Sequence, residues 1–99
     1  MTPPVGCSAD SFALRVHAPG MTPRFRDGEL IFVDPQRDAR HGDFVVVRLA
    51  GGEVLLRELL IEAGLRMLRA THPDWPAPLR TLDASDTLVG VVIARLERF

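Results

Sequence analysis

The side chains that could do chemistry in this chain are few and scattered. The three histidines, His17, His41 and His72, are isolated, with no second ligand at the spacings that zinc sites use. The single cysteine, Cys7, lies in a segment rich in Pro and Gly, without the fixed base or electropositive surroundings that activate a thiol. The sequence therefore predicts no metal site, no cofactor and no thiol nucleophile.

Two other patterns fall short of a site. A phosphate loop needs several backbone amides converging at a helix start and usually a lysine, so Gly51-Gly52 is interpreted as a hairpin turn. No two carboxylates are placed to flank one bond of a substrate. We expect solvated turns and strand ends for the acidic residues Asp27, Glu29, Asp34, Asp38 and Asp43.

The basic residues are all of one kind. All 12 are arginine, and the chain contains no lysine. Any mechanism that needs a lysine amine is therefore excluded within this chain. The net charge of -1 also argues against DNA binding by this chain alone, because a DNA-binding surface needs excess positive charge to displace counterions from phosphates.

Length and composition indicate one globular domain. The chain has 99 residues, of which 46% are hydrophobic and 25% charged. We expect a flexible leader over residues 1–10 and the domain over residues 11–99. The single cysteine and the lack of a signal sequence favour a cytoplasmic setting, and no apolar run approaches the roughly 20 residues that cross a membrane.

Alternation and turn signals predict a mostly β fold of short strands and hairpins. Phe12, Leu14 and Val16 alternate with more polar residues, as in a strand with one buried face. Glycine, proline and aspartate, which favour turns, then occur at short intervals along the chain. Further strands are predicted over residues 30–33, 44–49, 54–60, 65–70 and 88–96.

Two segments are less clear. Thr22 can cap a short helix with Pro23 at its first position, lasting to about Asp27. The leucines of residues 54–63 also fit a short helix. We favour a strand there, because glycine turns bracket the segment and it is short for a helix.

A set of short motifs occurs in a specific order along the chain. Each is weak alone, but their order and spacing together resemble the C-terminal domain of LexA-type and phage-type repressors, the S24 serine peptidase family. The resemblance runs from Phe12 to about Val92 and implies a compact β fold like that of LexA and signal peptidases. The motifs are residues 21–29, 33–35, 42–47, 52–54, the 68–76 loop with His72-Pro73-Asp74-Trp75-Pro76, and 89–92.

The resemblance also implies where a nucleophile and a base would lie. In the family the turn typically reads Gly-Asp-Ser-Met, and alignment on residues 21–23 puts its catalytic serine at Gly20. The family's general base is a lysine in a segment resembling Glu-Val-x-Val-Lys-Arg, and it falls at Arg57. Hydroxyl attack needs an oxygen, and an arginine with a pKa above about 12 stays charged where a buried lysine can lose its proton.

The expected result is a vestigial cleft with no intact catalytic residue. Its residues are Pro19, Gly20, Met21 and Arg57. Glycine at position 20 is interpreted as the residue that best tolerates an unusual backbone angle once the serine is no longer needed. We therefore predict a protein that is not an enzyme.

The resemblance implies a regulatory role through association. Domains of this type pair through the C-terminal strand region and are tethered to an N-terminal helix-turn-helix domain that reads DNA, and no such domain is present in these 99 residues. An apolar terminal strand must be paired or covered, so we expect a homodimer. The predicted dimerisation residues are Leu88, Val89, Val91, Val92, Ile93 and Leu96.

Two alternatives stay open. The old cleft could bind an extended peptide by strand addition, with Arg57 suited to an acidic residue or a chain end. An active, self-cleaving serine peptidase would require compensation for two separate losses. No membrane partner is expected.

Overall fold

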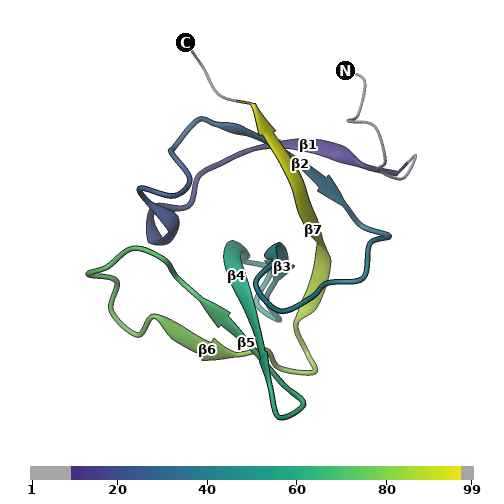
Figure 1. Ribbon diagram of the computed structural model, residues 1–99, viewed down its shortest axis with the longest axis vertical. Coiled ribbons are helices and arrows are strands. Elements are labelled where there is room, and N and C mark those ends of the chain that lie inside the picture. Colours follow the sequence, from purple (N-terminus) through teal and green to yellow (C-terminus); the bar gives the residue numbers. More distant parts are fainter. Residues whose placement is uncertain (1–9, 97–99) are drawn as a thin grey trace.

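The computed structural model describes residues 10–96, and these form one curled antiparallel sheet (Figure 1). The seven strands pair in the order β1-β2-β7-β3-β4-β5-β6. Every pairing is antiparallel. The predicted mostly β fold is confirmed. The elements are β1 (Phe12–Arg15), η1 (Pro19–Met21), β2 (Leu30–Asp34), β3 (Phe44–Arg48), β4 (Val54–Glu62), β5 (Leu65–Arg69), β6 (Leu79–Thr81) and β7 (Thr87–Leu96).

Both faces of the sheet are covered at its centre. Successive side chains of a strand point to opposite faces, and the three central valines of β3 are all buried. Val46 packs into one cluster, while Val45 and Val47 pack into another. The first core contains Val16, Ala18, Met21, Phe25, Ile31, Val33, Val46 and Leu56. The second core contains Val45, Val47, Leu59, Leu68 and Val91.

The ambiguous segment over residues 54–63 forms β4, so the strand interpretation is confirmed. β4 pairs with β3 on one side and with β5 on the other. The turn to β5 is Ala63-Gly64, where both residues have positive φ (51° and 80°), the geometry that matches the twist of a two-residue hairpin. Tertiary pairing on both sides therefore decides against a helix.

The helix predicted after Thr22 is wrong. The helical turn is η1, which ends before that residue, and Thr22 is extended with ψ of 146°. Extended backbone is normal for a residue that caps a helix, but turns and a bend, not a helix, follow Thr22. The Thr22 hydroxyl instead donates a hydrogen bond to the Pro19 carbonyl at 2.9 Å.

The apolar C-terminal strand, which was expected to need a partner, is already paired within the sheet. β7 lies between β2 and β3 and pairs with β3 through residues 87–91 and with β2 through residues 91–96 (Figure 1). The edges of the sheet are β1 and β6. The sequence could not show this, because an apolar run reads alike in an edge strand and in a central one.

One strand was not predicted. β6 has three residues, all exposed, and pairs with Met67–Arg69 at the far edge. It lacks the apolar alternation that identifies a strand in sequence. The predicted leader falls outside the described residues except for Asp10. Within residues 10–96, no helix is long and apolar enough to cross a membrane.

Candidate functional site

η1 and β4 bring Gly20 and Arg57 together. A Cβ atom built on Gly20 would lie 3.1 Å from Arg57 Nη2 and 3.1 Å from Trp75 Cε2. Gly20 is not among the residues with positive φ. The expectation that an unusual backbone angle requires this glycine is therefore wrong, and its physical reason is the close approach of two large side chains.

The Arg57 guanidinium is half-buried and poorly compensated. Its Nη1 donates a hydrogen bond to the Leu56 carbonyl at 2.8 Å, and its Cζ lies 5.7 Å from the centre of the Trp75 ring. Burial lowers the pKa of Arg57 from its ordinary value, and the negative charge of Glu53 partly offsets this effect. A guanidinium remains protonated in proteins, so Arg57 contributes a positive charge and no base.

The loop between β5 and β6 positions Trp75 beside Arg57. The backbone N–H of His72 donates to the Gly20 carbonyl at 2.9 Å, and Trp75 N donates to His72 O at 3.1 Å. The rings of His72 and Trp75 meet edge to face at 6.3 Å. Sequence reasoning quoted Trp75 in a motif but did not place it in the site. The signal was its uniqueness, because the chain has one Trp and no Tyr.

Two hydroxyl groups lie near η1. Thr22 Oγ1 donates to the Pro19 carbonyl at 2.9 Å, and Thr71 Oγ1 donates to the Met21 carbonyl at 3.3 Å. A nucleophilic hydroxyl must instead give its proton to a base. In the described part of the chain, neither threonine has a hydrogen bond to a side chain that could act as that base.

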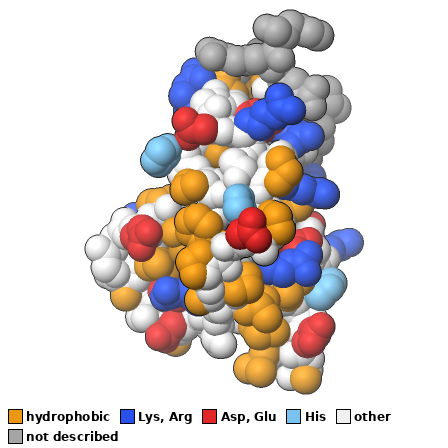
Figure 2. All heavy atoms as spheres, turned by 90° about the vertical axis from the view of Figure 1, so that its left-hand side faces the viewer, with side chains coloured by type: hydrophobic (Ala, Val, Ile, Leu, Met, Phe, Trp, Pro, Cys, Tyr) orange, Lys and Arg blue, Asp and Glu red, His pale blue; other side chains and the backbone are white. Residues whose placement is uncertain are grey.

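Two hollows flank β4 beside this site. One, of about 210 Å³, is lined by Arg57, Trp75, Glu53 and Arg80 together with apolar side chains. The other, of about 300 Å³, runs along β1. Leu55 lines both, so they lie next to each other. Figure 2 faces the side of the molecule on which η1 lies, and hydrophobic side chains gather there from the centre of the face to its lower end.

The predicted cleft residues therefore have different positions. Arg57 lines the first hollow, and Gly20 touches its wall through Arg57 and Trp75. Met21 has no exposed surface and belongs to the first core. Pro19 is exposed and begins η1. Only Gly20 and Arg57 of the predicted set are in a position to shape a binding surface with Trp75.

The predicted dimerisation residues also divide into two groups. Leu88, Val89 and Val92 pack against the cores, and Val91 is fully buried in the second. These four stabilise the fold. Ile93 and Leu96 belong to neither core, and Leu96 is 51% exposed.

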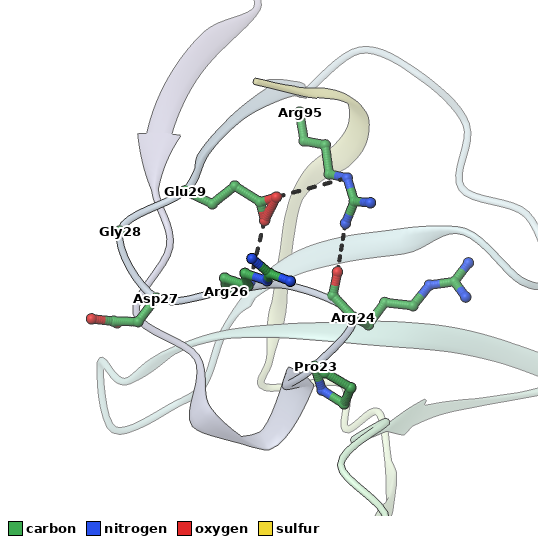
Figure 3. A pocket seen from close by; sticks show the side chains of 7 residues that line it. All are labelled: Pro23, Arg24, Arg26, Asp27, Gly28, Glu29 and Arg95. Atoms are coloured by element: carbon green, nitrogen blue, oxygen red, sulfur yellow. Dashed lines mark hydrogen bonds and ion pairs between the residues drawn. The ribbon is translucent and has the colours of Figure 1, made fainter. Parts of the chain in front are cut away.

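A further pocket, of about 380 Å³, lies at the end of β7 (Figure 3). Arg95 Nη1 donates to the Arg24 carbonyl at 2.5 Å, and its Nε lies 3.7 Å from Glu29 Oε1. Glu29 also accepts a hydrogen bond from the Arg26 backbone N–H at 3.2 Å. Figure 3 shows the Asp27 side chain pointing away from this group. These contacts tie the end of β7 to the turn before β2.

The histidines and carboxylates of the described residues do not gather into a metal-binding cluster. Within residues 10–96, no group of three or more His, Cys, Asp and Glu side chains is placed to hold a metal ion. Instead, His41 Nδ1 accepts a hydrogen bond from the backbone N–H of Ile61 at 2.8 Å. His17 lies 2.8 Å from the Asp27 carboxylate on the surface.

Comparison with known protein families gives a match over most of the chain. The family model described as Peptidase S24-like matches residues 3–93. The chain belongs to the S24-like family. Its curled antiparallel sheet is a LexA-like β fold, as the order of the motifs predicted.

The S24-like chain is similar to curated repressors. It is 35% identical over 91 residues to the prophage repressor CohE of Escherichia coli, covering 91% of this chain and 41% of that protein. It is 33% identical over 94 residues to the repressor protein C2 of Salmonella phage P22, covering 90% of this chain and 43% of C2. It is 35% identical over 83 residues to the LexA repressor of Verrucomicrobium spinosum, covering 81% of this chain and 40% of that repressor. The chain thus spans about two fifths of the length of these relatives.

Proposed function

We propose that this chain is a catalytically inactive S24-like domain that serves as the regulatory and dimerisation module of a repressor. The observation that carries this proposal is the contact between Gly20 and Arg57. The resemblance assigns the family's serine and lysine to these positions, and here they hold no attacking oxygen and no proton acceptor. In this account the domain has lost hydrolysis and keeps its ability to associate.

The proposed dimer surface is the outer face of β2 and β7. Leu30 pairs with Leu96 and Phe32 pairs with Ala94, so these four side chains lie on one face, opposite the first core. None of the four belongs to either core. Such an apolar face is suited to burial against a second copy around a two-fold axis. DNA reading would then belong to a helix-turn-helix domain outside this chain, with the dimer setting the spacing of two such domains.

Sedimentation equilibrium tests this proposal. The wild-type chain is expected to dimerise in the micromolar range, and Leu96→Glu is expected to shift it to monomer because a buried carboxylate is costly. Leu65→Glu is the matched control, since Leu65 is 59% exposed at the distant β4–β5 turn and Leu96 is 51% exposed. A wild type that stays monomeric at high micromolar concentration contradicts the proposal.

A second candidate function is peptide binding at the cleft. The observation that favours it is the pair of hollows that share Leu55, one along the edge strand β1 and one beside Arg57. A sheet edge has unpaired backbone groups that can hold an extended peptide, and neighbouring hollows can select its side chains. This function is compatible with dimerisation through β2 and β7.

A further inference from the structure

Only one N–H donor of the Arg57 guanidinium has a hydrogen-bond acceptor in the described part of the chain. Nη1 is bound to the Leu56 carbonyl. Within residues 10–96, the structure gives the other N–H groups of Arg57 no hydrogen bond and no carboxylate within 4.0 Å. A half-buried charge in this situation gains the most from a bound anion, because water has been partly removed and no ion pair replaces it.

The surroundings of Arg57 favour a particular anion. The hollow beside it, of about 210 Å³, is smaller than the roughly 300–1,000 Å³ of drug-sized sites, so it suits one side chain or a chain end. Leu55, Leu68 and Pro78 supply an apolar wall. Glu53 lies in the same lining and disfavours a doubly charged group such as phosphate.

Trp75 and Gly20 shape the space around the guanidinium. The indole ring lies under it at 5.7 Å, a cation–π arrangement that leaves the edge of the fork available for a planar acceptor. A side chain at position 20 would come within 3.1 Å of Nη2. Glycine there leaves the guanidinium its space.

We propose that the cleft formed by Arg57, Trp75 and Gly20 binds a peptide carboxylate, either the α-carboxylate of a chain end or the side chain of Asp or Glu. This inference rests on the peptide-binding function proposed above and names the chemistry that the site selects. The guanidinium donates two parallel hydrogen bonds to the carboxylate, while the residue that carries it enters the apolar hollow. The arginine that cannot act as a base thus acts as an anchor.

Trp75 provides the measurement, because it is the single tryptophan of a chain without tyrosine. The full chain is titrated with N-acetyl-Ala-Leu carrying a free carboxylate, with the C-terminal amide of the same peptide, and with N-acetyl-Ala-Glu amide. Tryptophan fluorescence is expected to report binding of the free acid at least about tenfold tighter than binding of the amide. The Glu peptide separates the two sources: binding equal to the free acid assigns the site to acidic side chains as well, and weaker binding assigns it to chain ends.

Three variants make the test specific to this site. Arg57→Gln is expected to remove the preference for the free acid, and Arg57→Lys to weaken it, because an ammonium lacks the two-pronged geometry. Arg66→Gln is the control, since Arg66 is an exposed arginine on β5 outside both hollows. Circular dichroism confirms that each variant is folded.

Three results overturn the proposal: the free acid and the Glu peptide both binding no tighter than the Leu amide, a preference for a carboxylate that survives Arg57→Gln, or no fluorescence change with any peptide at about 10 mM. Sedimentation of the same samples measures dimerisation, so failure of the carboxylate site can be distinguished from failure of the proposed repressor role. A chain that dimerises without binding a carboxylate retains its proposed regulatory role and loses only the anchor.

Discussion

Two glycines in this protein lie close to neighbouring atoms, but the neighbours differ in how easily they can move. At Gly90, on β7, an added Cβ would lie 2.6 Å from Val33 Cγ1 and 2.9 Å from the Asp34 carbonyl oxygen. At Gly20 the nearest atoms belong to the Arg57 guanidinium and the Trp75 indole ring, both at 3.1 Å from an added Cβ. The first glycine is held against backbone, and the second lies against groups that can move.

The difference follows from where each glycine lies. β7 crosses between β2 and β3, and the pairing register shifts on both sides, between Phe32 and Val33 and between Val46 and Val47. The strands approach each other closely at Gly90, and backbone hydrogen bonds between strands hold its neighbours in place. The Gly20 cleft lies beside an open hollow, so displaced side chains have space. The centre of the sheet therefore governs stability, and the cleft is the site proposed for recognition.

The largest effect is expected from Gly90→Ala. Because the new methyl group meets a carbonyl oxygen that cannot move away, β2 and β7 must separate, at a cost of about 3 kcal/mol in unfolding free energy. Urea unfolding followed by circular dichroism measures the loss. Gly51→Ala is the control, since Gly51 has nothing within 4 Å and no positive φ, and it is expected to change stability by less than about 0.5 kcal/mol. Equal stability of the two variants would contradict the close packing of β7.

Trp75→Ala comes next. The side chain is half-buried, so its loss is expected to cost about 2 kcal/mol, below the value for a fully buried aromatic ring. Trp75→Phe should restore most of the stability, because it keeps a ring over the guanidinium. Urea unfolding followed by circular dichroism compares the variants with wild type. An alanine variant as stable as wild type would show that the ring does not pack against Arg57.

Gly20→Ala is expected to have the smallest effect on stability, about 1 kcal/mol or less, because only side-chain atoms lie near the new methyl group and the guanidinium and the indole can shift by a few tenths of an ångström. The variant should also shift the fluorescence of Trp75, because the new methyl group displaces the indole ring. A large loss of stability with unchanged fluorescence would place a rigid neighbour at position 20 and erase the contrast with Gly90.

Much of the fold was predictable from local signals. Alternation identified β1, and glycine turns identified the hairpins on either side of β4. The position of β7 inside the sheet depends on pairing between distant segments, and an apolar run does not reveal its neighbours. The helical turn was misplaced because Thr22 and Pro23 match the cap and the first position of a helix, and no local signal shows that turns follow them instead.

The site was predictable in part. Motif order pointed to positions 20 and 57, and the structure brings them together. The reason for the glycine was wrong, because a close approach by Trp75, from a loop far away in sequence, cannot be distinguished from a demand for positive φ. Trp75 itself was missed as a site residue, since its role depends on how the loop folds back onto η1 through His72 and Gly20.

The most direct test of the central claim is a search for self-cleavage. The natural protein that carries this domain is incubated at alkaline pH, which favours deprotonation of any base, and its intact mass is followed over time. The account predicts a single unchanged mass in wild type and in Arg57→Gln alike, because positions 20 and 57 offer neither an attacking oxygen nor a proton acceptor. A shorter product that forms reproducibly and disappears in Arg57→Gln or Thr71→Val would contradict it.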